Sequence, residues 1–250
     1  MIAVFDSGVG GISALLPLAR RLPQTDILYL ADGASLPLGE KSPAEIRERL
    51  RRALSYLSSF RPSAVLIACG TASAFCDGET RSRFSFPIFD VIAPTAHAIL
   101  DASPTESILL LGTAATVRAG VFARAIAACG QRVDALACPH LVSLAEAPAI
   151  PDPALLWQAT RPAVRLAPSH LVLGCTHFSL LSSQLCALFP TARLWDAATI
   201  AAHAMADALP PLPPERGECR FLTTAACAPL RRRLAPYFSR RPRVSRVHLS

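Results

Sequence analysis

Two short aliphatic runs, each followed directly by a cysteine, constrain the fold of this chain more than any other feature. The first run, Ala64–Ala68, precedes Cys69, and the second, His170–Gly174, precedes Cys175. Aliphatic runs bounded by small residues are typical of strands buried in a parallel sheet. Open sheets of this kind bind ligands at the carboxyl ends of their strands. Each cysteine is therefore expected at a ligand-binding edge.

Short aliphatic runs alternate with longer amphipathic stretches along most of the chain, which is typical of βα units and a parallel sheet. Strands are predicted at Ile2–Phe5, Asp26–Ala31, Ala64–Ala68, Ser107–Gly112, Arg132–Ala137, His170–Gly174, Ala192–Trp195 and Cys219–Leu222. Helices are predicted near Gly11–Leu22, Pro43–Phe60, Thr116–Cys129, Ala154–Leu166, Ser179–Phe189 and Thr199–Ala208.

The repeated strand–cysteine unit predicts an α/β fold of two similar lobes. Each lobe is expected to hold a central, mainly parallel sheet flanked by helices, with the active site in the cleft between the lobes. The proline-rich segment 209–214 interrupts the pattern in the manner of a linker. The strand and helix after it are too short for a domain, so we expect them to rejoin the first lobe. The predicted lobes are residues 1–93 plus 209–250, and residues 94–208.

Composition argues against several classes of protein. No apolar stretch approaches the roughly 18–20 residues that a membrane helix needs, and no leader precedes the first predicted strand. We therefore expect a cytoplasmic protein without a membrane partner, whose eight cysteines are reduced thiols. None of them forms a CxxC pair, and no two histidines are four residues apart, so no metal site is predicted.

The formal net charge is +7, and arginines gather near the end of the chain, in Arg231–Arg233 and Arg240–Arg243. A basic stripe of this kind is one way to bind nucleic acid. No recognisable nucleic-acid module accompanies it, however, and charge runs are more often a solvated helix face. We expect no nucleic-acid partner, and a secondary binding role for these arginines is the weaker alternative.

The residues at the strand ends indicate acid–base chemistry. Asp6 is an ionisable group that ends the first strand and is followed by a glycine-rich turn, whose free N–H groups suit an anion such as a carboxylate. Two thiols that face each other across a cleft would place a proton donor and a proton acceptor on opposite sides of one carbon. That arrangement suits racemisation. The alternative is that Cys69 and Cys175 are simply small buried hydrophobic residues.

Several short motifs follow one another along the chain: Phe5–Gly11, Asp32 with Pro37 and Gly39, Lys41–Ser42, Ala68–Ala74, Gly112–Val117, Ala137–Pro139 with Glu146, and Leu173–His177. Together they resemble the glutamate racemases of the cofactor-independent aspartate/glutamate racemase superfamily. The resemblance extends from about residue 2 to about residue 196 and becomes loose beyond that point.

The resemblance implies that Cys69 and Cys175 are the two catalytic acid/bases, the first acting on the α-proton of the D-enantiomer and the second on that of the L-enantiomer. It implies that Asp6 assists Cys69, and that Glu146 and His177 assist Cys175. Substrate would be held by Ser7, Pro37, Leu38, Gly39, Gly70, Thr71, Thr113, Thr116 and Thr176. The expected reaction converts L-glutamate into D-glutamate for peptidoglycan, without a cofactor or a metal.

The chain departs from this family at three positions. The family usually has asparagine at Gly70, tyrosine at Leu38 and serine at Ala197. Gly70 is expected to remove a side-chain amide from the substrate site, and a hydrogen bond to a charged ligand contributes about 1.5–3 kcal/mol. A racemase of aspartate or another small acidic amino acid therefore stays an alternative, and the sequence leaves a homodimer open.

Overall fold

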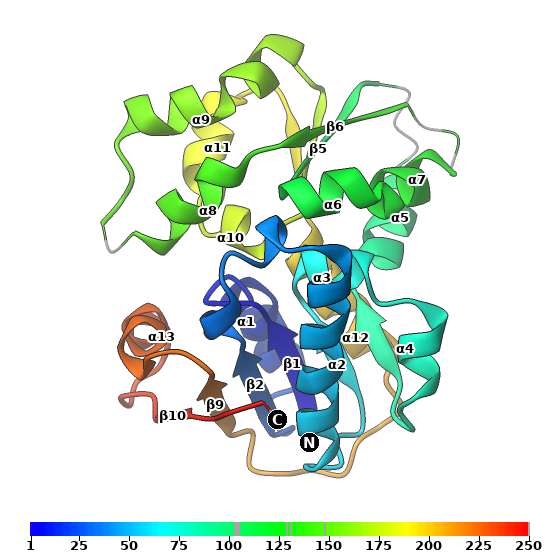
Figure 1. The fold of residues 1–250 in the computed structure, drawn as a ribbon, viewed down its shortest axis with the longest axis vertical. Helices are drawn as coiled ribbons and strands as arrows, with labels where there is room; N and C mark the ends of the chain where they lie inside the picture. Colours follow the sequence, from blue (N-terminus) through cyan, green and yellow to red (C-terminus); the bar gives the residue numbers. More distant parts are fainter. Residues whose placement is uncertain (103–105, 129, 131, 148, 250) are drawn as a thin grey trace.

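Two parallel sheets flanked by helices make up the fold, one in the lower half and one in the upper half of Figure 1. The computed structural model describes residues 1–102, 106–128, 130, 132–147 and 149–249. Its two α/β lobes confirm the fold class that the sequence predicts.

The lower sheet has six strands in the order β10-β9-β2-β1-β3-β4, and every neighbouring pair is parallel. Its strands are β1 (Ile2–Asp6), β2 (Ile27–Ala31), β3 (Val65–Ile67), β4 (Ile88–Asp90), β9 (Cys219–Thr223) and β10 (Val244–Arg246). The C-terminal segment thus adds its strands to the sheet of the N-terminal residues, as β9 pairs directly with β2.

The upper sheet has four parallel strands in the order β6-β5-β7-β8. These are β5 (Ile108–Gly112), β6 (Val133–Ala137), β7 (His170–Leu173) and β8 (Arg193–Asp196). The central strands β5 and β7 are buried along their whole length, as expected of strands covered by helices on both faces.

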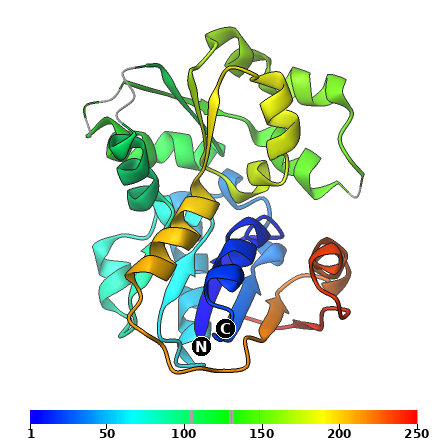
Figure 2. The same ribbon diagram turned by 180° about the vertical axis from the view of Figure 1, so that it is seen from behind.

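Helices cover both sheets. They are α1 (Ile12–Arg21), α2 (Pro43–Ser58), α3 (Gly70–Ala74), α4 (Gly78–Ser82), α5 (Ile92–Asp101), α6 (Ala114–Ala119), α7 (Val121–Ala127), α8 (Pro139–Glu146), α9 (Pro153–Leu166), α10 (Thr176–Ser179), α11 (Ser182–Leu188), α12 (Ala197–Ala208) and α13 (Cys227–Leu234). Although α12 lies in the range predicted for the second lobe, it packs against α1 and lies on the face of the lower sheet that is turned toward the viewer in Figure 2.

Two of the predicted helices are each divided. The predicted helix Thr116–Cys129 is α6 followed by α7, because Gly120 between them adopts a left-handed φ of 65°; Cys129 itself lies outside the described residues. The predicted helix Ser179–Phe189 is α10 followed by α11, and α10 already begins at Thr176.

An ion pair with a buried carboxylate anchors the loop that follows β2. Asp32, at the end of this strand, accepts hydrogen bonds from Arg49 of α2 and, at 2.7 Å, from the Thr224 hydroxyl after β9. The carboxylate is buried, so these donors replace the water it has lost. The anchored loop continues into two turns of 3₁₀ helix, Gly33–Ser35 and Leu38–Glu40.

The arginine-rich segment begins on α13. The Arg233 side chain donates hydrogen bonds to the carbonyls of Ala145 and Ala147 at the end of α8, so this arginine links the two lobes. Arg232, Arg240, Arg241 and Arg243 are exposed.

Within the described ranges, no helix combines the length and the apolar character needed to cross a membrane. Each of the seven cysteines described there is a free thiol.

Ser42 begins α2 with a capping box. Its hydroxyl accepts from the Glu45 N–H, and the Glu45 carboxylate accepts from the Ser42 N–H at 2.9 Å. We predict that Ser42→Ala lowers the free energy of unfolding by about 0.5–2 kcal/mol, measured by urea titration. The control Ser55→Ala, at an exposed position of the same helix, should change it by no more than about 0.5 kcal/mol. Equal losses in both variants would contradict a capping role.

Candidate active site

The cavity between the lobes is built from the carboxyl ends of both sheets. Loops after β1, β2 and β3 contribute from the lower lobe, and loops after β5, β6 and β7 contribute from the upper lobe. Parallel strands make this possible because all their carboxyl ends lie at one edge of a sheet. The lining residues are Ser7, Leu36, Pro37, Leu38, Gly39, Glu40, Cys69, Thr71, Thr113, Ala114, Pro139, Val142, Cys175 and His177.

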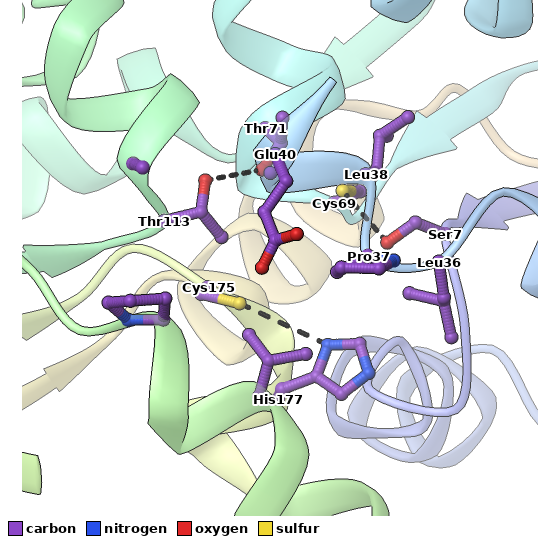
Figure 3. A pocket seen from close by; sticks show the side chains of 14 residues that line it. Ser7, Leu36, Pro37, Leu38, Glu40, Cys69, Thr71, Thr113, Cys175 and His177 are labelled. Carbon is purple, nitrogen blue, oxygen red and sulfur yellow. Dashed lines mark hydrogen bonds between the residues drawn. The ribbon is translucent and has the colours of Figure 1, made fainter.

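Cys69 and Cys175 lie in different walls of this cavity, with their sulfur atoms turned toward it (Figure 3). Cys69 precedes α3 and Cys175 precedes α10, so each occupies the turn between a strand and a short helix. Both are buried, with 4% and 7% of their surface exposed. The cavity is narrow, since the centre of a water molecule can occupy only about 20 Å³ of it. That is about the room that one water needs.

The surroundings of Cys69 favour its neutral thiol. The thiol lies 3.3 Å from the Ser7 hydroxyl, to which it donates. Burial raises its pKa, the negative charge of Asp6 raises it further, and the hydrogen bond with Ser7 opposes them only in part; the pKa is about 12. Cys69 therefore holds a proton at neutral pH.

Asp6 is the last residue of β1, and its side chain bridges the two lobes. Its carboxylate accepts a hydrogen bond from the Gly8 N–H at 2.9 Å and another from the Thr176 hydroxyl at 3.0 Å. Burial raises the pKa of Asp6, although the nearby His177 and these hydrogen bonds oppose the rise. Ser7, and not Asp6, contacts the Cys69 sulfur, so any effect of Asp6 on Cys69 is electrostatic. Assistance of Cys69 by Asp6 remains a prediction.

Cys175, His177 and Glu146 form a chain of polar contacts. His177 Nδ1 lies 4.0 Å from the Cys175 sulfur, and its Nε2 lies 2.6 Å from Glu146 Oε1. Burial lowers the pKa of His177, but its contacts with Cys175 and Glu146 outweigh burial and raise it to about 10. Burial also raises the pKa of Glu146, yet its hydrogen bond to His177 brings that pKa below the usual value. The pair is therefore an imidazolium and a carboxylate beside the Cys175 sulfur.

Three threonine hydroxyls join the lobes on the other side of the cavity. Thr71 Oγ1 lies 2.8 Å from Thr113 Oγ1 and 3.3 Å from Thr116 Oγ1, while Thr113 and Thr116 are 2.9 Å apart. Hydroxyls can both donate and accept, so this cluster can turn its donors toward a carboxylate that enters the cavity.

The predicted substrate-binding residues fall into two groups in the structure. Ser7, Pro37, Leu38, Gly39, Thr71 and Thr113 line the cavity, whereas Gly70, Thr116 and Thr176 are not among its lining residues. Gly70 rests against the Gly174 carbonyl, where there is no space for the amide side chain whose loss the sequence predicted. The substrate-binding roles of all nine remain predictions.

Sequence reasoning did not select Leu36, Glu40, Ala114, Pro139 or Val142. Glu40 could have been selected from the sequence, because it directly follows the Pro37–Gly39 motif. Its carboxylate points into the cavity in Figure 3. No cluster of three His, Cys, Asp or Glu side chains suited to a metal ion occurs among the described residues. The chemistry that the site does offer is proton transfer, with a protonated thiol in one wall and a thiol beside an imidazolium in the other.

The His177–Glu146 contact predicts a titration shift. Removing the carboxylate charge with Glu146→Gln should move the His177 pKa from about 10 toward its ordinary value of 6.5, which NMR of the imidazole resonances measures. A matched control is Glu79→Gln, because Glu79 is an exposed carboxylate that pairs with Arg83. An unchanged His177 pKa in Glu146→Gln would contradict the stabilisation of the cation by this carboxylate.

The same contact predicts how stability depends on pH. Folding raises the His177 pKa, so the stabilisation is fully present below about pH 6.5 and is lost as the pH rises through 10. The difference in unfolding free energy between the wild type and Glu146→Gln should therefore shrink between pH 6.5 and 10, measured by urea unfolding at several pH values. A difference that grows over this range would contradict the assignment.

Comparisons with known proteins show the family to which this chain belongs. The model of the family Asp/Glu/Hydantoin racemase matches residues 12–205. The glutamate racemase of Gloeobacter violaceus is 36% identical over 238 residues, which cover 91% of this chain and 85% of the relative. The glutamate racemase of Rippkaea orientalis is 37% identical over 203 residues, which cover 79% of this chain and 72% of the relative.

Solved structures show the same architecture. A glutamate racemase isoform from Bacillus anthracis superposes with a TM-score of 0.91 at 26% identity, covering 100% of this chain and 97% of that chain. Escherichia coli glutamate racemase, solved in complex with L-glutamate and the activator UDP-MurNAc-ala, gives a TM-score of 0.83 at 27% identity, covering 100% and 98%. Family model, relatives and fold together show that this chain is an enzyme of the Asp/Glu/hydantoin racemase family.

Proposed function

We propose that the protein interconverts L- and D-glutamate by moving protons between the substrate and two cysteines, without a cofactor. The observation that carries the proposal is the placement of Cys69 and Cys175 in different walls of one cavity, each with its own polar partner. The relatives named glutamate racemases and the Escherichia coli structure with L-glutamate bound support glutamate as the substrate.

In the direction from L- to D-glutamate, Cys175 acts as the base. The imidazolium of His177 lies beside its sulfur, and the thiolate is the reactive form of cysteine. The thiolate removes the α-proton, and the Cys69 thiol returns a proton to the opposite face of the same carbon. Because Cys69 is protonated at neutral pH, this direction begins from the protonation state that the surroundings favour.

The reverse direction needs the opposite assignment, with Cys69 as thiolate and Cys175 as thiol. In both directions negative charge develops on the substrate's α-carboxylate as the proton leaves, and nearby donors stabilise it. We assign this role to the hydroxyls of Ser7, Thr71 and Thr113, which line the cavity.

D-glutamate is a building block of peptidoglycan, and we propose that supplying it in the cytoplasm is the role of this enzyme. The narrowness of the cavity and Leu38 in its lining keep one alternative, racemisation of aspartate or a smaller acidic amino acid at the same site. A panel of amino acids ranked by kcat/KM decides between them, and a wide lead for glutamate would remove the alternative.

Incubation with L-glutamate in D₂O tests the proposal directly. Two-base transfer predicts that D-glutamate forms and that it carries deuterium at Cα, because the thiols exchange with solvent before they return a proton. Chiral chromatography and mass spectrometry measure both outcomes. If neither D-glutamate nor deuterium at Cα appears, glutamate racemisation is excluded.

Substitution of either cysteine tests whether both thiols are needed for proton transfer. Cys69→Ser and Cys175→Ser should each lower racemisation in both directions by about 100- to 10,000-fold, because every turnover needs one group to accept a proton and another to donate one. Cys186→Ser is the matched control, since this cysteine is exposed on α11. A near wild-type rate in either cavity variant would remove that cysteine from the mechanism.

A partial reaction separates the two variants. With 3-chloroglutamate, a single thiolate removes the α-proton, and chloride leaves the β-carbon with its bonding electrons. Cys69→Ser retains the thiol that acts on the L-enantiomer, and Cys175→Ser retains the thiol that acts on the D-enantiomer. Each variant should therefore eliminate from one enantiomer in preference to the other, measured by chloride release. The reverse preference would exchange the two assignments.

A further inference from the structure

Gly70 contacts the opposite lobe more closely than a side chain allows. A Cβ atom at this position would lie 1.8 Å from the carbonyl oxygen of Gly174. Cβ atoms in proteins essentially never approach another heavy atom within 3.0 Å. A residue with a side chain would thus require a shift of at least 1.2 Å at this contact, and the atoms that it meets belong to the backbone.

This contact joins the backbones next to the two catalytic thiols. Gly70 directly follows Cys69 in the lower lobe, and Gly174 directly precedes Cys175 in the upper lobe. A displacement between the two glycines is therefore transmitted to the two sulfur atoms.

Both sides of the contact are rigid. The Gly174 N–H donates to the Leu111 carbonyl at 2.9 Å, which fixes the end of β7 to β5. On the other side, the Cys69 carbonyl accepts from the Ser73 N–H at 2.9 Å in the first turn of α3. Because each backbone is held by its own lobe, an added Cβ has to move one lobe relative to the other.

Two further glycines of the lower lobe meet the upper lobe with similarly little space. A Cβ at Gly10 would lie 2.5 Å from the Thr176 hydroxyl and 2.7 Å from the backbone nitrogen of His177. A Cβ at Gly39 would lie 2.4 Å from the Thr113 Cβ. The loops after β1, β2 and β3 therefore each touch the upper lobe through a glycine.

We propose that Gly70 is a positioning residue which, together with Gly39, sets the separation of Cys69 and Cys175 across the substrate carbon. This inference rests on the proposed two-cysteine racemisation. The lobes approach until backbone meets backbone, and the narrow cavity between the thiols is the result. Glycine at position 70 thus allows a closer approach of the two lobes than the asparagine that is usual in the family would.

The proposal predicts a selective loss. A misplacement of about 1 Å between reacting groups can lower the rate about 100-fold, so Gly70→Ala should lower kcat for glutamate racemisation by about that factor. Elimination from 3-chloroglutamate needs only one thiolate and should fall by less than about 10-fold by the same reasoning. The ratio of racemisation to elimination is the readout, because a merely unstable protein would lose both activities together.

The experiment compares the full-length wild type with Gly70→Ala, Gly39→Ala and Gly78→Ala. Gly78 is the matched control, since a Cβ there meets no atom within 4 Å. The ratio should be lowest in Gly70→Ala, intermediate in Gly39→Ala, where the overlap is smaller, and unchanged in Gly78→Ala. Thermal unfolding reports whether each variant is folded. If Gly70→Ala does not fold, a lowered ratio in Gly39→Ala supports the proposal and an unchanged ratio overturns it.

A wild-type ratio in a folded Gly70→Ala variant would also overturn the proposal. Racemisation of glutamate by the wild type shows whether the positioning role or the proposed function has failed. A wild type that racemises glutamate beside an unaffected Gly70→Ala refutes the positioning role alone. A wild type that does not racemise glutamate refutes the function on which it rests.

Discussion

The direct contact between the carboxyl edges of two parallel sheets is the constraint on which the site depends. Every loop that lines the cavity leaves a strand at one of these edges. Buried hydrogen bonds between the lobes hold the edges together, from Thr176 to Asp6 on one side of the cavity and between Thr71 and Thr113 on the other. Separating the lobes leaves these groups without their partners, and water must replace them.

The two halves of the site are alike in backbone and opposite in charge. Each half is a strand, a cysteine and a short helix, yet a buried carboxylate lies near Cys69 and an imidazolium lies beside Cys175. Burial and the negative charge of Asp6 raise the pKa of the Cys69 thiol. On the proposed two-cysteine mechanism, the direction that needs a Cys69 thiolate therefore begins from the less favoured protonation state.

The strands that consist of buried aliphatic runs were predictable from the sequence. A continuous run of apolar residues is what a strand shows when both of its faces are buried. The predictions missed β4 and β10, which have three residues each and lie at the two edges of the lower sheet, where the burial pattern is weak. They also missed α3, which is made of glycine, alanine, serine and threonine. Such small residues carry no amphipathic signal, and tertiary contacts decide their conformation.

Site residues were predictable to different degrees for the same reason. Cys69 and Cys175 end recognisable strands, so their place at a sheet edge followed from local sequence. Glu146 ends a helix, and its contact in the site is with His177, 31 residues further along the chain. Without the family resemblance, no feature of the neighbouring sequence predicts a role for Glu146. The consequence of Gly70 was also hidden, since a sequence shows that a side chain is absent and does not show what fills its place.

The pairing of β9 with β2 has a consequence for how the chain acquires its structure. Ile27 is aligned with Cys219, so the lower sheet joins strands from opposite ends of the chain, whereas all strands of the upper sheet lie between Ile108 and Asp196. Contacts between residues so distant in sequence form slowly, because the intervening loop must first close. During synthesis the upper sheet has all its strands before β9 exists. Until then one side of β2 is an unpaired edge, the kind of surface at which strands of other molecules attach.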